Sequence, residues 1–568
     1  MCFSLNLFLE RILKNKLMNN KLCNYPAHYG LIALTFLLGV GFALYNPHKF
    51  PADDALFYVQ VAKNIAALGQ STFNTITETN GYHPLWLLMC IPFASIPFHN
   101  PDNLVRAIML LQGVLFVASL WQLNKLAKRV AINATIPMAV LSVIFIGKGT
   151  LFLMETFAAL LFLMICLQRF AQQRELESLL NSNKALLFTS VIAGLLILSR
   201  LDLVFFVALM MMVIFVSHWK ALGAKQAINK GFFLALPAFL MVVIYLSINY
   251  TVFGLLFPIS GLIKRAEVFS FDVHRLGTEG VLLASTTLVI FIVIVIRKYC
   301  LPRYHEKFQA IEAVLFLLFF SNFVYFLYVT FTMNDAAPWY YLLAYVLCAL
   351  FAGYIVKLCS TVSLIEPYLP YLSSLLLVLL LAISLTFSFL RTYTNYSLFY
   401  AFQTLGKTGT FWQFDSARKT LAHELTQLLP NHASVLVFDT PGILALYTQL
   451  HIFPTDGLMT GLSYDRNLQI QGTLVYFCSR NVDYFLSPLP TENHLIYNGN
   501  NFTLTTVPRG YLLTLSSPIT KQDVAPILLT PENLLHTMEN PLNKAQWNWF
   551  PHLGLWQLPC NEQERTTP

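Results

Sequence analysis

Charged side chains are scarce in this sequence of 568 residues and account for only 11% of it. Soluble domains carry about 25% charged residues, because a surface that faces water needs them. Hydrophobic residues make up 56% of the chain, aromatic residues make up 14%, and the mean hydropathy is +0.60. The composition therefore excludes an ordinary soluble protein and predicts an α-helical polytopic membrane protein.

Cysteine motifs are also missing. The nine cysteines show no CxxC or CxxH spacing, so the sequence signals neither a zinc site nor a disulfide scaffold, and no metal ligands are predicted. Three cysteines (Cys90, Cys166 and Cys348) lie in apolar runs and are interpreted as small core residues. Cys478 and Cys560 lie in the polar tail and could pair if that tail is extracytoplasmic. No spacing rule decides that pairing, and the sequence leaves it open.

The sequence lacks internal repeats, low-complexity segments and a strongly basic domain. Residues 1–399 contain 27 Lys and Arg against 16 Asp and Glu, whereas residues 400–568 contain 9 against 12. The basic excess thus belongs to loops beside membrane spans, as is typical of cytoplasmic loops. Nothing in this distribution indicates nucleic acid as a partner.

The basic loops orient the chain, since Lys and Arg favour the cytoplasmic side. Residues 1–28 are expected to form a cytoplasmic amphipathic N-terminus, and residues 30–45 an uncleaved signal anchor. If the basic loops lie on the cytoplasmic side of the membrane, the loops between them and the whole C-terminal tail lie on the outer side. The basic loops are 125–129, 168–174, 218–230 and 297–307.

Further apolar runs predict about 11–13 membrane segments. One conflict stays open, because two full crossings between 84 and 123 would place the basic loop 125–129 outside. Either the run 84–98 is a short re-entrant segment, or one loop breaks the charge rule. The runs after the anchor are 84–98, 104–123, 131–147, 150–168, 185–198, 202–217, 231–252, 280–296, 309–331, 338–357 and 370–390.

Three regions are predicted along the chain. The N-terminus, 1–28, is followed by a transmembrane domain, 29–399, whose first outer loop is 47–83. Residues 400–568 are expected to form an extracytoplasmic α/β domain, which is large enough for a core of its own. Its predicted helices are 417–430 and 441–450, and its predicted strands are 433–439, 482–490 and 501–507.

Polar side chains gather at the loops that this topology places outside. Such groups are costly in or beside a membrane span, and they are therefore candidates for function. The cluster indicates a site at the outer face of the membrane. Its members are Asp53, Asp54, His83, Glu155, Arg200, Asp202, Lys264, Arg265 and Asp335.

Asp53 and Asp54 begin the segment PADDALFYVQVAKN, in which small residues recur at helical spacing. One interpretation makes Asp53 a helix N-cap, which accepts hydrogen bonds from the first turn. A cap needs only one carboxylate, so a second interpretation gives the pair a catalytic use, to accept a proton and orient a hydroxyl. The two interpretations are compatible, because a cap also fixes the position of the carboxylate.

Other members of the cluster allow two interpretations each. His83, in NGYHPLW, is either a solvated turn residue or a hydrogen-bonding group for a substrate. Glu155 lies in apolar sequence and needs a partner, for which Lys148 is the candidate. Arg200 and Asp202 form either an internal ion pair that orders two spans or a contact with substrate.

Lys264 and Arg265 are adjacent cations on a loop assigned to the outer side. On a cytoplasmic loop they would be explained by snorkelling at a span end, but outside a phosphate partner becomes attractive. Trp339 and Tyr340 are interpreted as an aromatic belt or as a platform on which a sugar stacks. Tyr58, within the opening segment, is also a candidate for substrate binding.

The stretch DDALFYVQVAKNIAALGQSTFN…TNGYHPLW resembles the first outer loop of GT-C glycosyltransferases, polytopic enzymes that take a sugar from a polyprenyl-phosphate carrier. It is similar to the bacterial branch related to protein O-mannosyltransferases, lipid A aminoarabinose transferases and arabinofuranosyltransferases. LMET at 153–156, SRLD at 199–202 and the FG…P.SG..K arrangement at 253–264 also fit, although many relatives carry Gly where this chain has Leu153. The tail DTPGILALYTQLHIFPTDGL resembles the extracytoplasmic domain often attached to these enzymes.

This resemblance implies a GT-C-like fold in which residues 29–399 form the catalytic domain. It implies Asp53 as the general base, assisted by Asp54 and His83, and Lys264 with Arg265 as the clamp for the carrier phosphate. A glycosyl phosphate needs no general acid, because phosphate leaves as a stable anion if cations receive its charge. Attack from the opposite face would invert the anomeric centre. A divalent cation, Mg or Mn, near Asp53 and Asp54 is left open as a cofactor.

We therefore predict an inverting glycosyltransferase in a bacterial inner membrane, with its active site and C-terminal domain on the periplasmic side. The predicted partners are a polyprenyl-phosphate-linked sugar, membrane lipids, and a glycan, lipid or protein acceptor. One alternative is a transporter or flippase of a lipid-linked sugar, although the repeated halves typical of transporters are missing. Another is a non-catalytic membrane scaffold, which would leave the outer-face cluster without a use.

Overall fold

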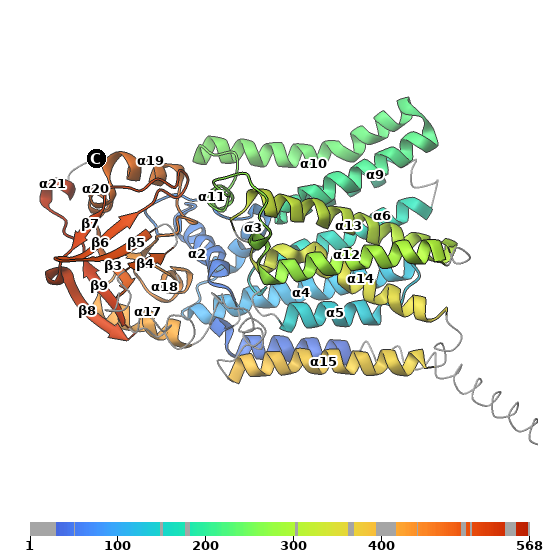
Figure 1. Cartoon of the computed structure of the whole chain (residues 1–568), viewed down its shortest axis with the longest axis horizontal. Helices are drawn as coiled ribbons and strands as arrows, with labels where there is room; N and C mark the ends of the chain where they lie inside the picture. Colours follow the sequence, from blue (N-terminus) through green and yellow to red (C-terminus); the bar gives the residue numbers. More distant parts are fainter. Residues whose placement is uncertain are drawn as a thin grey trace, which may run out of the picture.

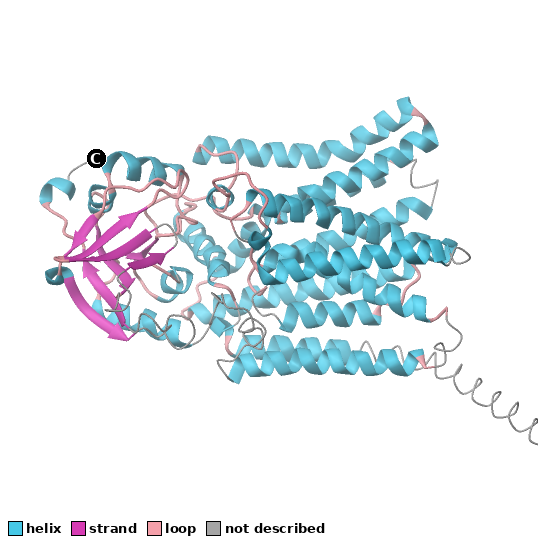
Figure 2. Ribbon diagram, in the orientation of Figure 1, coloured by secondary structure: helices cyan, strands magenta, loops and turns pink. Residues whose placement is uncertain are grey.

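The computed structural model describes residues 30–49, 51–147, 151–175, 182–300, 305–334, 336–361, 368–393, 416–439, 441–489, 496–499, 502–539 and 552–565. The predicted N-terminal segment, 1–28, lies outside the described residues. A bundle of long helices forms one end of the molecule, and a domain with two sheets forms the other (Figures 1 and 2). The predicted fold class, a helical membrane protein with a C-terminal α/β domain, is confirmed.

Within the described residues, six stretches of helix are long and apolar enough to cross a membrane. Only 11% of the apolar 18-residue stretch of α10 is buried, as expected for a helix that faces lipid. The six contain α4 (Pro101–Arg129), η2 (Leu201–Leu203) with α9 (Val204–Leu222), α10 (Ala224–Phe253), η3 (Val273–Leu276) with α12 (Gly277–Cys300), α13 (His305–Thr332), and η5 (Pro338–Tyr341) with α14 (Leu342–Cys359). Shorter apolar helices run beside them (Figure 1): Gly30–Tyr45, α5 (Thr135–Gly147), α6 (Thr156–Glu175), α8 (Asn183–Ser199) and α15 (Leu369–Tyr393).

The structure shows how many times residues 84–123 cross the membrane, which the sequence left open. The run 84–98 contains α3 (Pro84–Ala94), an 11-residue helix at the end of the bundle beside α2 (Asp53–Leu68). Such a helix rises about 16 Å, roughly half of a hydrocarbon core of about 30 Å, so it does not cross. The single crossing between this loop and 125–129 is therefore α4. The described basic loops 125–129, 168–174 and 218–230 then lie together at the end of the bundle away from the C-terminal domain (Figure 1).

The C-terminal domain contains a five-stranded sheet in the order β2-β1-β3-β9-β8. Its central strand β3 pairs in parallel with β1 and antiparallel with β9. The predicted helices at 417–430 and 441–450 and the predicted strands at 433–439, 482–490 and 501–507 are confirmed. The strands of this sheet are β1 (Ser434–Val437), β2 (His451–Pro454), β3 (Val482–Pro488), β8 (Leu534–Glu539) and β9 (His552–Gln557).

A second, antiparallel sheet of four strands follows the order β4-β5-β6-β7. Its strands are β4 (Ile496–Gly499), β5 (Phe502–Val507), β6 (Gly510–Leu515) and β7 (Ile527–Leu529). The helical elements of the domain are α17 (Ser416–Leu428), α18 (Pro441–Tyr447), α19 (Leu462–Gln471), α20 (Thr473–Cys478), η6 (Pro531–Asn533) and α21 (Glu562–Arg565). The remaining elements of the outer loops are η1 (Pro47–Lys49) and α11 (Ile259–Ile263).

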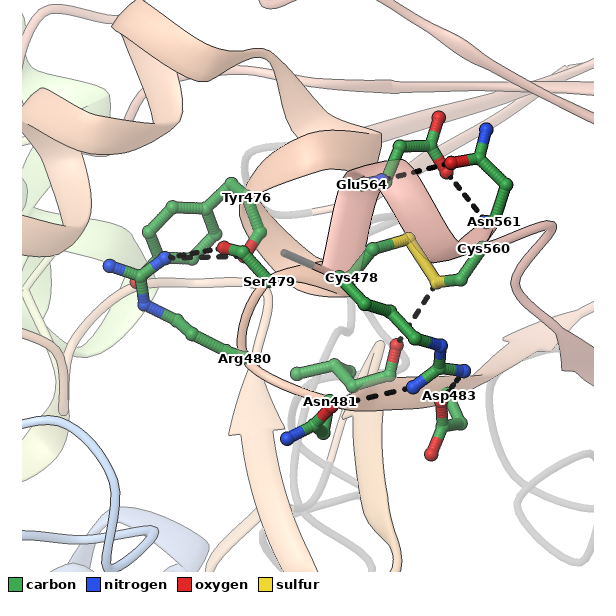
Figure 3. Close-up of a disulfide and its surroundings, with 11 residues drawn as sticks. Tyr476, Cys478, Ser479, Arg480, Asn481, Asp483, Cys560, Asn561 and Glu564 are labelled. Atoms are coloured by element: carbon green, nitrogen blue, oxygen red, sulfur yellow. Dashed lines mark hydrogen bonds and ion pairs between the residues drawn. A yellow bond between two sulfur atoms is a disulfide. The ribbon is translucent and has the colours of Figure 1, made fainter. Parts of the chain in front are cut away.

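A disulfide joins Cys478, at the end of α20, to Cys560, which follows β9 (Figure 3). The pairing that the sequence left open is therefore formed, and its Cα atoms lie 5.5 Å apart. Cys90 and Cys166 are fully buried in the helical bundle, as predicted for small core residues, and Cys348 is half-buried. A disulfide persists in an oxidising compartment, so this bond is consistent with a domain outside the cytoplasm.

The C-terminal domain packs directly onto the first outer loop. Buried apolar side chains of both regions belong to one continuous core. Polar contacts cross the junction: Asp102 Oδ2 lies 2.9 Å from Lys419 Nζ, and Thr75 Oγ1 lies 2.7 Å from His451 Nδ1. The outer loops are therefore held between the membrane helices and the sheet domain.

Candidate functional site

A pocket lies where the first outer loop, the loop before α12, the segment before α14 and the C-terminal domain meet. It brings together many of the predicted side chains from distant parts of the sequence. Two residues of the C-terminal domain, Leu458 and Met459, also line it. The predicted residues that line the pocket are Asp54, Tyr58, His83, Glu155, Lys264, Trp339 and Tyr340.

Asp54 and Lys264 form an ion pair at the pocket. Asp54 Oδ2 lies 3.5 Å from Lys264 Nζ, and the two side chains are 19% and 26% exposed. The ammonium also donates to the Tyr340 hydroxyl at 3.4 Å. Burial lowers the pKa of Lys264, but the nearby Tyr340 and Asp54 raise it by more. The pKa of Lys264 therefore lies above its ordinary value. At the pocket, the carboxylate of Asp54 thus lies beside a firmly charged cation, Lys264.

The backbone around Lys264 is fixed by the first outer loop. The side chain of Asn80 accepts the N–H of Ile259 at 3.0 Å and donates to the carbonyl of Phe257. Asn334 then donates its N–H to the carbonyl of Lys264 at 2.9 Å. The short helix α11 is therefore anchored on both sides, and Lys264 at its end is directed to the pocket.

Asp53 lies elsewhere, and the assignment of Asp53 as base needs correction. Its side chain is 3% exposed, does not line the pocket, and accepts the backbone N–H groups of Gly442 at 2.8 Å and Ile443 at 3.0 Å. The N-cap of α2 is Ala52, without a side-chain hydrogen bond, so Asp53 does not cap its own helix either. Asp53 instead caps α18 of the C-terminal domain. Adjacent residues on a helix point about 100° apart, so the side chain of Asp54 faces a different direction. Of the two adjacent acids, Asp54 is the one that lines the pocket.

Glu155 is almost fully buried and surrounded by partners. The hydroxyl of Tyr58 donates to Glu155 Oε2 at 3.1 Å, and the guanidinium of Arg200 lies 3.7 Å from Oε1. His83 Nε2 lies 3.8 Å from the same oxygen. Lys148, the partner expected from the sequence, lies outside the described residues. Glu155 therefore has its charge balanced by Arg200 and holds the phenol of Tyr58 in place.

His83 precedes α3 and shares this network. Its Nδ1 accepts the N–H of Leu201 at 3.4 Å, and its own N–H donates to the Tyr58 hydroxyl at 3.3 Å. Burial lowers the pKa of His83, although Glu155 opposes this effect. A neutral ring that accepts at Nδ1 carries its proton at Nε2, toward Glu155.

Arg200 and Asp202 form the internal ion pair that was one of the two interpretations. Arg200 is fully buried, and its Nε and Nη2 donate to the two carboxylate oxygens of Asp202 at 3.1 and 2.6 Å. Nη1 also donates to the carbonyl of Trp339. Neither Arg200 nor Asp202 lines the pocket, so their contacts position Glu155 and the segment of Trp339.

The aromatic pair before α14 lies at the pocket. Trp339 is buried, whereas the ring of Tyr340 lies near two cations, with Arg200 Cζ and Lys264 Nζ 5.3 and 5.6 Å from its centroid. Arg265 is exposed and does not belong to the described residues that line the pocket. Lys264 is therefore the cation of the predicted pair that the structure brings to the site. Asp335 lies outside the described residues.

Leu153 has a left-handed backbone conformation, with φ of +62°. Glycine favours this region, as expected from the Gly of the enzymes that this motif resembles. Here Gln112 accepts the N–H of Leu153 at 2.7 Å and donates to the carbonyl of Met154 at 2.7 Å, and Trp86 donates to the carbonyl of Leu153 at 2.8 Å. These bonds hold the turn that carries Glu155 in spite of the leucine.

A divalent cation near Asp53 and Asp54 has no support from these contacts. Both oxygens of Asp53 accept backbone N–H groups, and the ammonium of Lys264 lies beside Asp54. Within the described part of the chain, no three His, Cys, Asp or Glu side chains lie close enough together to hold a metal. The cation stays a prediction, and no step below depends on it.

The sequence did not predict that the C-terminal domain would take part in this site. Leu458 and Met459 line the pocket, and Asp456 lies close enough to Asp54 and Lys264 to interact with their charges. The only local signal was the Asp-Gly pair of TDGLM, which indicates a turn and nothing about its neighbours. Contacts between distant segments cannot be read from one sequence.

No protein-family model matches the chain, and no curated protein matches it in sequence. Solved structures align with most of the chain. ArnT from Cupriavidus metallidurans in the apo state shares 11% identity at a TM-score of 0.48, over 82% of this chain and 94% of that one. The Archaeoglobus fulgidus oligosaccharyltransferase tethered with an acceptor peptide shares 12% identity at a TM-score of 0.43, over 82% and 69% of the two chains.

The same oligosaccharyltransferase in complex with Zn and sulfate is also similar, with 12% identity and a TM-score of 0.38 over 81% and 68% of the two chains. ArnT and the oligosaccharyltransferase are GT-C glycosyltransferases, the superfamily that the motifs of this sequence resemble. At such low identities and TM-scores, the role of each residue rests on the geometry of this chain.

Proposed function

We propose that this protein is an inverting glycosyltransferase that moves a sugar from a polyprenyl-phosphate carrier to an extracytoplasmic glycan, lipid or protein acceptor. The observation that carries the proposal is the pairing of Asp54 with Lys264 in a pocket at the outer end of the helical bundle. Transfer from a glycosyl phosphate requires a base and a cation, and Asp54 and Lys264 can supply them.

The pair suggests how donor binding prepares the base. Lys264 Nζ lies 3.5 Å from the carboxylate of Asp54, which balances its charge. A donor phosphate would compete for the ammonium and form a charge-assisted contact with it. Asp54 would then lose its partner and become available to take the proton of an acceptor hydroxyl. The phosphate would leave with the electron pair of the broken C–O bond, and Lys264 would stabilise its charge.

The remaining pocket residues have supporting roles. The ring of Tyr340 lies against the two cations and presents its hydroxyl to Lys264. Tyr58 and His83 line the pocket and direct their polar hydrogens to Glu155, which holds both side chains in place. The phenol oxygen of Tyr58 keeps the capacity to accept a hydrogen bond from a sugar hydroxyl. These contacts support substrate binding by Tyr58, His83 and Tyr340, and positioning by Glu155 and Arg200.

The proposed placement of the site is the periplasmic side of a bacterial inner membrane. Two independent observations support it. The described basic loops lie at the end of the bundle away from the pocket, as the charge rule expects for a cytoplasmic end. The Cys478–Cys560 disulfide belongs to an oxidising compartment, and the domain that contains it contacts the pocket.

Turnover by the purified chain in nanodiscs tests this proposal. The wild type would be offered a panel of polyprenyl-phosphate sugars with glycan, lipid and peptide acceptors, and release of polyprenyl phosphate would be followed. We expect release from at least one donor and an inverted anomeric configuration in the product, seen by nuclear magnetic resonance. A product with the donor's configuration would contradict direct attack by the acceptor.

The transporter alternative gives a different result in proteoliposomes. A flippase would move a labelled lipid-linked sugar across the bilayer without cleaving it. Movement of intact donor, with no polyprenyl phosphate released in any combination of donor and acceptor, would contradict the proposal and favour transport.

A further inference from the structure

A cavity lies between helices of the bundle and runs from the end away from the C-terminal domain toward the centre. Its volume is about 340 Å³, within the range of about 300–1,000 Å³ that is typical of ligand pockets. Helix α13 forms one wall, and α6, α9 and α12 form the others. The lining residues outside α13 are Phe170, Leu209, Val213 and Lys298. None of the residues that line the candidate functional site belongs to this cavity.

The wall from α13 is a single stripe of that helix. Its residues recur at intervals of three or four, which places them on one face. From the first to the last of them the helix rises about 16 Å. One leaflet of the hydrocarbon core is about 15 Å thick, so the stripe has the length of one layer of acyl chains. The stripe consists of Gln309, Glu312, Ala313, Phe316, Leu317 and Phe320.

The stripe is polar at one end and apolar at the other. Gln309 and Glu312 lie near the start of α13, at the end of the bundle, and the aromatic residues follow toward the centre. Phe320 is 46% exposed on a helix long and apolar enough to span the membrane, where its neighbours are lipid tails. The cavity is therefore open to the bilayer, and its order of polar and apolar groups is that of a lipid that enters from one leaflet.

Two adjacent cations, Arg297 and Lys298, lie in the last turn of α12. Arg297 is buried and pairs with Glu312, which also accepts the hydroxyl of Tyr354 at 3.0 Å. That pair is neutral as a whole. Lys298 is exposed, lines the cavity, and forms no ion pair with any of the described residues. The polar end of the cavity thus has one positive charge in excess, which is complementary to a phosphate group.

We propose that this cavity binds an anionic phospholipid, with an acyl chain along the α13 stripe and the phosphate at Lys298. Basic pockets between transmembrane helices at the cytoplasmic side suit anionic headgroups. A zwitterionic headgroup would add an ammonium, and Glu312, the carboxylate in the wall, is already held by Arg297 and Tyr354. The bound lipid would stabilise the packing of the four helices, because it binds the folded state alone.

Lipid binding to the full chain in detergent micelles tests the role of the charge. Native mass spectrometry would compare phosphatidylglycerol with phosphatidylcholine of the same acyl chains. The wild type should bind phosphatidylglycerol more tightly, and Lys298→Gln should weaken this binding about 5-fold, as expected for one lysine near an anionic headgroup. Lys220→Gln is the matched control, because Lys220 is exposed in the last turn of α9 and does not line the cavity. Equal affinity of the wild type for the two lipids, or equal losses in the two variants, would overturn the proposal.

A second pair of variants tests the place of the acyl chain. Val213→Phe places a larger side chain in the cavity, whereas Val216→Phe enlarges an exposed residue of the same helix that does not line it. Phosphatidylglycerol with a photoreactive diazirine in its acyl chain should label the wild type at the α13 segment that contains Phe316 and Phe320. Val213→Phe should lose this label and Val216→Phe should keep it, with circular dichroism as the check on folding.

The position of the label in the wild type decides the proposal even if Val213→Phe fails to fold. Helix α10, which is mostly exposed to lipid, provides the background for contact with bulk lipid. Labelling of α13 well above this background would support a bound lipid. Labelling of α10 and α13 to the same extent, or a label that persists in folded Val213→Phe, would overturn the site.

Discussion

The carboxylate of Asp53 accepts the backbone N–H of Gly442 at 2.8 Å, across 389 residues of sequence. Its neighbour Asp54 faces the pocket and pairs with Lys264. The two adjacent acids of the first outer loop therefore have separate tasks. Asp53 fixes the C-terminal domain on α2, and Asp54 takes part in the proposed chemistry.

Replacing Asp53 should weaken the junction between the two domains. In Asp53→Asn one carboxylate oxygen becomes an amide that cannot accept the N–H of Gly442 or Ile443, and the negative charge is lost. Hydrogen bonds to a charged group contribute about 1.5–3 kcal/mol, so a loss of this order is expected. Thermal melting and limited proteolysis of the C-terminal domain would measure it. Asp523→Asn, at an exposed acid of the same domain that accepts from the Ser516 hydroxyl, is the control. Equal melting of the two variants would contradict the role of Asp53.

Lys264 should account for most of the affinity for the donor phosphate. Lys264→Gln removes the cation from the pocket, and donor binding should weaken about 10- to 100-fold, as expected for loss of a charge-assisted contact. Arg265→Gln changes the adjacent cation, which is exposed and does not line the pocket, and should bind normally. Binding would be measured by titration of the lipid-linked sugar in nanodiscs. Equal losses of donor affinity in the two variants would contradict a specific role of Lys264 and indicate a general effect of positive charge.

Gln112 should be needed for the turn that carries Glu155. Gln112→Leu leaves the Leu153 N–H and the Met154 carbonyl without this partner in a buried position, at about 1–3 kcal/mol each. Gln122→Leu, on the same helix, removes an oxygen that has no hydrogen-bond partner among the described residues, and it should cost much less. The melting temperatures of the two variants provide the comparison. A larger loss in Gln122→Leu would refute this account of the turn.

Leu153→Gly separates backbone strain from side-chain packing. The left-handed conformation costs a leucine about 1–2 kcal/mol, which glycine would relieve. The side chain is fully buried, however, and truncating a buried leucine costs about 3–5 kcal/mol. Packing should therefore win, and the variant should melt below the wild type. A higher melting temperature would show that strain is the larger effect.

Gly81→Ala should separate the loop 456–461 from the pocket. The new Cβ would lie 2.1 Å from the carbonyl of Leu458, so the loop must move. We expect lower turnover with intact helices, seen by circular dichroism. Gly261→Ala in α11 is the control, because nothing lies within 4 Å of its Cβ position. Full activity in Gly81→Ala would contradict the need for close contact between the two loops.

The sequence predicted the helical spans because apolar runs report burial in lipid directly. It left the segment 84–98 open, since composition alone cannot tell a short helix at the membrane surface from a crossing. The choice between Asp53 and Asp54 depends on the direction in which each side chain points. That direction is fixed by contact with α18, which lies almost 400 residues further along the chain. For the same reason Asp456 and the Cys478–Cys560 bond became visible only in three dimensions.

The central claim is that Asp54, and not Asp53, is the base. The most direct measurement is the rate of polyprenyl-phosphate release by Asp54→Asn and Asp53→Asn, with donor affinity determined on the same preparations. We predict that Asp54→Asn binds donor and loses turnover by about 100- to 10,000-fold, as expected when a general base is removed, while correctly folded Asp53→Asn keeps most of its turnover. Near-normal turnover by Asp54→Asn, with turnover abolished in folded Asp53→Asn, would contradict the assignment.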